Sequence, residues 1–184
     1  TLLIGAAVLL RRPNDPATLH FFWLAVAFFG VFAFSFNGRL DRLDWIFYWG
    51  DVIAILLLPP MFAHFVMVFP ERSNVWGKWT GRGLTFLYLI AAILGALRVA
   101  TFVSGASPTA LTGFLSNLDR LQPLFLAICL VSGLGVLASA LRSVQSITAR
   151  RQLQWIAWGT ALGATPFVLI HAVPYALGIE PSLG

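Results

Sequence analysis

The chain alternates between long apolar runs and short polar segments. The apolar runs cover residues 1–10, 19–36, 45–69, 83–103, 121–141 and 153–177. The last five have about the 20 residues that a helix needs to cross a hydrocarbon core of about 30 Å, whereas the first is too short. The pattern predicts an all-α fold, a polytopic transmembrane helix bundle of about six spans with the first one truncated. The short connections favour up-and-down packing of antiparallel neighbours.

The polar segments between the runs differ in their content of Lys and Arg. Segments 11–16, 70–82 and 142–152 together carry eight of these cations, whereas segments 37–44 and 104–120 carry three. Basic loops stay on the cytoplasmic side of a membrane. We therefore expect a multi-pass protein of the bacterial inner membrane, with loops 11–16, 70–82 and 142–152 in the cytoplasm.

Composition supports a lipid environment. Of the 184 residues, 59% are hydrophobic and 10% are charged, whereas soluble domains carry about 25% charged residues. The net charge of +5 sits in short loops, which argues against a nucleic-acid partner and favours contact with membrane lipid. Because run 1–10 is too short to span, we expect a single transmembrane domain (1–184) that is a fragment of a longer chain. The cation count predicts that both of its ends lie outside, so a cytoplasmic domain after it would require seven or more spans.

Three ionisable residues fall inside apolar runs near their predicted outer ends: Asp51, Arg98 and His171. Charged groups within a span are costly, so each needs a partner or a function. One interpretation is a ligand pocket open to the outside, in which Asp51 and Arg98 form an ion pair. The alternative is that Arg98 extends to the lipid head groups and Asp51 faces interfacial water.

His20 and His64 are expected at one depth in the inner half of the membrane. Neutral imidazole can ligate a metal, a haem iron or the magnesium of a chlorophyll, which makes both residues candidate cofactor or pigment ligands. The alternative is that each is a hydrogen-bonded structural residue. The sequence itself requires no cofactor, and it contains no zinc motif or complete catalytic motif, so we expect no enzymatic activity from this region.

Three stretches resemble a known family. They are LLRRPNDPATLHFFWL (9–24), HFVMVFPER (64–72) and ARRQLQWIAWGTALGATPFVLIHAVP (149–174). They are similar to the amino-terminal membrane regions of multi-pass bacterial sensors that precede histidine-kinase, GAF or PP2C-type phosphatase domains, among them the quorum-sensing kinase of competence. In these stretches Arg72, Arg150, Arg151 and Trp155 are expected to anchor helix ends at the membrane interface.

The resemblance implies a membrane-embedded sensory input domain of a signal-transduction protein, with the output domain beyond residue 184, working as a homodimer. Two alternatives remain. The chain is a non-enzymatic accessory subunit of a larger membrane complex, for example a photosynthetic or respiratory one, or it is half of a transporter. The scarcity of acidic residues inside the spans disfavours the transporter.

Overall fold

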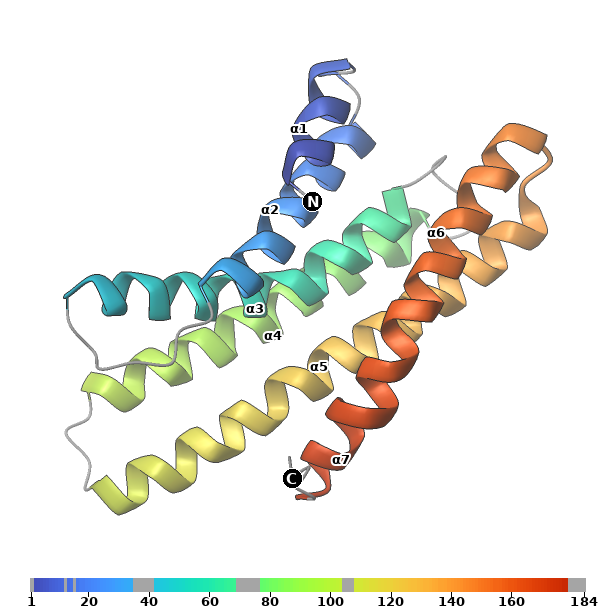
Figure 1. Ribbon diagram of the computed structural model, residues 1–184. Coiled ribbons are helices and arrows are strands. Elements are labelled where there is room, and N and C mark those ends of the chain that lie inside the picture. The colour runs from blue at the N-terminus through green and yellow to red at the C-terminus, as the bar shows by residue number, and fades with distance from the viewer. Residues whose placement is uncertain are drawn as a thin grey trace. The chain divides into compact units, whose positions relative to one another are not determined.

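The computed structural model describes residues 2–11, 13–14, 16–34, 42–68, 77–103 and 108–178, and all regular structure in these ranges is helical (Figure 1). The predicted all-α class is therefore confirmed. The elements are α1 (Leu2–Arg11), α2 (Pro16–Ala33), α3 (Arg42–Val68), α4 (Gly77–Val103), α5 (Pro108–Ser143), α6 (Ile147–Pro166), η2 (Phe167–Ala172) and α7 (Val173–Ala176).

Four helical segments are long and apolar enough to cross a membrane, which supports a membrane protein. They are Asp44–Val68, Gly81–Val103, Gly113–Ser143 and Ile147–Ala176. They correspond to the third to sixth predicted spans. The first two predicted spans are shorter apolar helices, Leu2–Arg11 and Pro16–Val31.

Several predicted loop boundaries were wrong. The segment 104–120 was expected to be a loop, but α5 already begins at Pro108. The segment 142–152 has only residues 144–146 outside helices, and α4 begins at Gly77, within the predicted loop 70–82. Hydropathy marks where a helix leaves the hydrocarbon, whereas the helix itself continues into the polar region until a cap or a turn ends it.

The chain divides into two compact units, Thr1–Gly95 and Ala96–Gly184. In the first unit α1 packs on α2, and α2 packs on α3. Glycines allow these helices to approach closely. A Cβ atom on Gly5 would lie 3.0 Å from the Cβ of Ala25, and one on Gly30 would lie 2.8 Å from the Cβ of Ala54. Small residues at helix contacts are typical of membrane bundles, because they let backbones come together.

In the second unit, α6 folds back along α5 after the turn at residues 144–146 (Figure 1). The side-chain oxygen of Ser146 caps α6 by accepting a hydrogen bond from the backbone N–H of Ala149. Leu137 and Leu153 are almost completely buried, whereas Trp155 and Trp158 are 80% and 67% exposed. Within the second unit, only a narrow face of α6 is therefore covered.

The sixth span changes from α-helix to π-helix immediately after Pro166. The N–H of Val173 donates to the carbonyl of Val168, five residues earlier. Pro166 and Pro174 have no N–H to donate, so the normal pattern of bonds to the fourth residue back is interrupted on both sides of this segment. Such interruptions are a recognised origin of π-helical turns and kinks.

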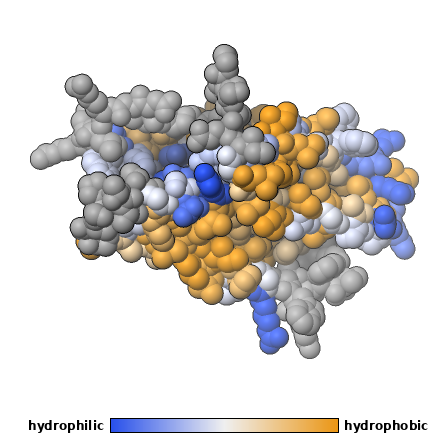
Figure 2. Space-filling model, turned by 90° about the horizontal axis from the view of Figure 1, so that it is seen from below, coloured by the Kyte–Doolittle hydropathy of each residue, from blue (hydrophilic) through white to orange (hydrophobic). Residues whose placement is uncertain are grey.

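Helix α5 has 36 residues, which gives it a length of about 54 Å at about 1.5 Å per residue. This exceeds a hydrocarbon core of about 30 Å. Apolar side chains also form a broad surface on the face shown in Figure 2, as expected for helices that are solvated by lipid.

Candidate functional site

The two candidate histidines of the first unit lie in direct contact. The ring centroids of His20 on α2 and His64 on α3 are 4.1 Å apart, with the rings edge to face. Nδ1 of His20 lies 2.6 Å from the carbonyl oxygen of Pro16, one turn earlier. Nδ1 of His64 lies 3.3 Å from the hydroxyl of Tyr88 on α4. His20, His64 and Tyr88 thus form a three-residue polar cluster, and the depth of the two histidines in a membrane stays a prediction.

This cluster has a defined hydrogen-bonding chemistry. A carbonyl only accepts, so Nδ1 of His20 carries the proton, which leaves its Nε2 as the ring acceptor. A histidine held in this way by a backbone carbonyl is oriented for ligation or proton exchange through Nε2. The described residues contain no group of three or more His, Cys, Asp or Glu side chains placed to hold a metal ion. Ligation of a metal, haem or pigment by His20 or His64 stays a prediction.

The three residues of the predicted outer pocket are divided between the units. Asp51 is half-buried on α3 in the first unit, whereas Arg98 and His171 belong to the second. Their meeting in one cavity therefore stays a prediction. Within the second unit, Nη2 of Arg98 lies 2.8 Å from Oδ1 of Asp119 on α5. The sequence did not suggest this partner, because Asp119 was assigned to a loop.

The Arg98–Asp119 ion pair lies among other polar groups. The side chain of Arg98 is 10% exposed and that of Asp119 is 41% exposed, so the cation is buried and the anion reaches the surface. Thr101, one turn after Arg98, donates from its hydroxyl to the Arg98 carbonyl at 2.7 Å. Gln122, one turn after Asp119, is also buried. Buried charge is tolerated where a partner compensates the loss of hydration.

Arg120, which follows Asp119 on α5, extends to the carboxyl end of α7. The guanidinium of Arg120 lies beside Gly178, with Nη1 3.7 Å from the position that a Cβ there would take. Gly178 ends the helical segment with a φ of +75°, a conformation that L side chains rarely adopt. A cation at a helix carboxyl end interacts favourably with the helix dipole. Asp119 and Arg120 therefore connect α5 to α4 and to the end of α7.

His171 is exposed and lies within η2. Its ring is 5.6 Å from that of Phe167 and is stacked at 5.8 Å on that of Tyr175. The three rings follow one another at intervals of four residues along the end of the sixth span. Such a ladder presents one imidazole between two aromatic rings at the surface of the second unit.

Among the predicted anchors, Arg150, Arg151 and Trp155 are exposed in the first turns of α6. This placement is compatible with anchoring at a membrane interface. Arg72 lies outside the described residues. Tyr88 and Asp119 were not predicted as site residues, although the scarcity of acidic residues in this chain could have singled out Asp119.

Comparison of the chain with protein-family models, with curated proteins and with solved structures found no match.

Proposed function

We propose that this chain is the membrane-embedded, non-catalytic input domain of a bacterial signal-transduction protein. The support comes from the resemblance of segments 9–24, 64–72 and 149–174 to sensor membrane regions, and from polar clusters held within apolar helices. A domain of this kind needs an element with two arrangements whose balance a signal shifts.

The observation that carries the proposal is the π-helical segment Phe167–Ala172. A π-helical turn holds one residue more than an α-helical turn, and such turns occur frequently at functional sites. Conversion to α-helix would rotate the residues beyond it and move the ring ladder of Phe167, His171 and Tyr175. This segment therefore supplies a local two-state element at the end of a span.

The test is Pro166→Ala in the chromosomal gene of the organism that encodes the chain. Alanine restores a backbone donor and favours continuous α-helix. We expect the variant to fix the genome-wide transcription profile in one state across growth conditions, with the protein present in normal amount.

The matched control is Pro123→Ala, because Pro123 lies inside α5 without any π-helical segment beside it. This control should retain the normal response. A gene deletion and a Pro166→Ala strain that both leave transcription unchanged would contradict the proposal.

We further propose the sidedness inferred from charge, with loops 11–16, 70–82 and 142–152 in the cytoplasm of an inner-membrane protein. Ser146 and Ser116 are both exposed, and they lie near opposite ends of α5. We expect a membrane-impermeant maleimide to label Ser116→Cys in intact spheroplasts and Ser146→Cys only after lysis. The reverse pattern would invert the topology.

A second candidate function is that of an accessory subunit in a larger membrane complex. The wide exposed face of α6, which includes Trp155, Trp158 and Leu162, favours this candidate because large aromatic side chains are common at protein interfaces. Copurification of the chain with other membrane subunits at fixed stoichiometry, together with loss of that assembly on deletion, would select it. Homodimer formation without other subunits would favour the sensor.

A further inference from the structure

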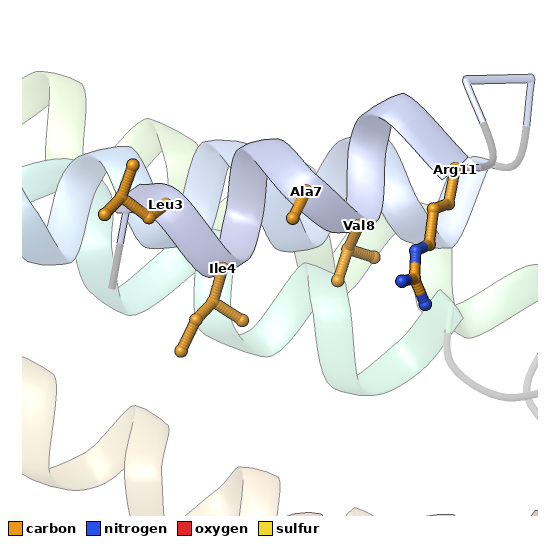
Figure 3. A pocket seen from close by; sticks show the side chains of 5 residues that line it. All are labelled: Leu3, Ile4, Ala7, Val8 and Arg11. Carbon is orange, nitrogen blue, oxygen red and sulfur yellow. The ribbon is translucent and has the colours of Figure 1, made fainter.

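Helix α1 carries an apolar groove that ends in a cation. The groove has a volume of about 280 Å³ and is lined by Leu3, Ile4, Ala7, Val8 and Arg11. Figure 3 shows these side chains projecting from one side of the helix, with Arg11 at its carboxyl end. Leu3 and Ile4 are 87% and 63% exposed, so the described residues of the first unit leave this face of α1 uncovered.

The opposite side of α1 fixes the helix in place. Gly5 is buried against α2, where the position of its missing Cβ lies 3.0 Å from the Cβ of Ala25. The close approach at Gly5 determines which side of α1 faces away from α2. All residues that line the groove belong to α1, and the packing of α1 on α2 fixes the direction in which they face.

The dimensions and charge of the groove match one half of a bilayer. Leu3 and Arg11 are eight residues apart, which corresponds to about 12 Å along a helix. One leaflet contributes about 15 Å to a hydrocarbon core of about 30 Å. An acyl chain laid along the apolar residues would bring its head group to Arg11, and a guanidinium forms charge-assisted, often bidentate hydrogen bonds with phosphate.

We propose that this groove is a binding site for an anionic phospholipid, with one acyl chain along Leu3, Ile4, Ala7 and Val8 and the phosphate at Arg11. The site is independent of the proposed sensory function. A lipid bound in this groove would have a longer residence time on the protein than the lipids that surround the other helices.

The experiment is native mass spectrometry of the purified protein in detergent, titrated with phosphatidylglycerol or with phosphatidylcholine. We expect Arg11→Gln to lower the affinity for phosphatidylglycerol about fivefold. This factor corresponds to a binding contribution of about 1 kcal/mol from one basic side chain near an anionic surface. Arg11→Lys should retain most of the affinity. Ala7→Trp fills the groove and should reduce binding of both lipids.

The matched controls are Arg150→Gln, which removes an exposed arginine that lies on no described groove, and Ala92→Trp, which places the same bulk on an exposed position of α4. Both should bind phosphatidylglycerol as the unaltered chain does, with unchanged circular dichroism. Equal losses in Arg11→Gln and Arg150→Gln would overturn the proposal. Undiminished lipid binding by Ala7→Trp would also overturn the proposal. The same holds if the chain forms a dimer and Ala7→Trp dissociates that dimer without changing the amount of bound lipid.

Discussion

Helices α3 and α6 are both long and apolar, but the chain covers them to very different extents. Half of the most apolar window of Asp44–Val68 is buried within the structure, whereas only 11% of the corresponding window of Ile147–Ala176 is buried. The two units also use glycine differently. Gly30 meets Ala54 in the first unit, whereas no atom of the described residues lies within 4 Å of a Cβ added to Gly159 or Gly163.

This difference indicates two ways of holding membrane helices together. Lipid is as apolar as a leucine side chain, so helices gain little from hiding apolar surface and depend on close packing and polar contacts. The first unit depends on close packing through Gly5 and Gly30. The second has polar contacts through Asp119 and Arg120, and its own residues leave one face of α6 uncovered.

The largest expected effect tests close packing in the first unit. Gly30→Leu would place a side chain where even a Cβ lies 2.8 Å from Ala54, and overpacking of this kind costs about 3 kcal/mol of unfolding free energy. Thermal or detergent-induced unfolding followed by circular dichroism measures it. Gly159→Leu is the matched control and should cost less than about 1 kcal/mol, because its surroundings are open. Equal losses would remove the contrast between the units.

The polar contact between α4 and α5 should give the next largest effect. Asp119→Asn removes the carboxylate that pairs with Arg98, whose side chain is only 10% exposed. We expect the unfolding free energy to fall by about 2 kcal/mol. This is less than the cost of breaking a fully buried ion pair, because Asp119 is partly solvated. Arg98→Gln leaves a carboxylate that is 41% exposed and should cost less. Unfolding of both variants in one detergent gives the comparison. A larger loss in Arg98→Gln would contradict this account of the ion pair.

A smaller effect is expected at the end of α7. Gly178→Ala would force an L side chain to adopt a φ of +75°, which costs about 1 kcal/mol. Gly135→Ala in the exposed part of α5 should instead stabilise the chain by up to about 1 kcal/mol, because alanine is the better helix former. Opposite shifts in melting temperature are the expected outcome, and shifts of the same sign would argue against the described end of the helix.

The smallest effect is expected on the open face of α6. Trp155→Ala should change the unfolding free energy by less than about 0.5 kcal/mol, because the side chain is 80% exposed and lies away from packed contacts. Leu153→Ala, two residues earlier and fully buried, should cost about 2 kcal/mol or more. A large loss in Trp155→Ala in the isolated chain would mean that this face is covered after all.

Hydropathy was enough to predict the helical class and the long third to sixth helices, because long apolar runs have few alternatives in lipid. It did not locate the helix ends at Pro108, Ser143 and Ile147. These ends depend on capping and on helical propensity in polar surroundings. The π-helical segment was also missed, because the effect of Pro166 depends on the neighbouring backbone bonds.

The candidate site was predicted less well than the fold. Residue counting along the helices predicted one depth for His20 and His64 but not the ring contact between them. It could not find Tyr88 or Asp119, because helix rotation decides which side chains meet. The close helix contacts at Gly5 and Gly30 likewise depend on helix rotation.

The length of α5 has a consequence for the ion pair. The three-residue turn after Ser143 ties one end of α5 to α6, so any excess length must emerge near Asp119 or be absorbed by tilting. We expect Asp119 to lie in water and to hold Arg98 weakly in a thin bilayer, and we expect lipid to surround the pair and strengthen the attraction in a thick one. Bilayer thickness is thus a physical variable that this helix converts into the strength of a single electrostatic contact.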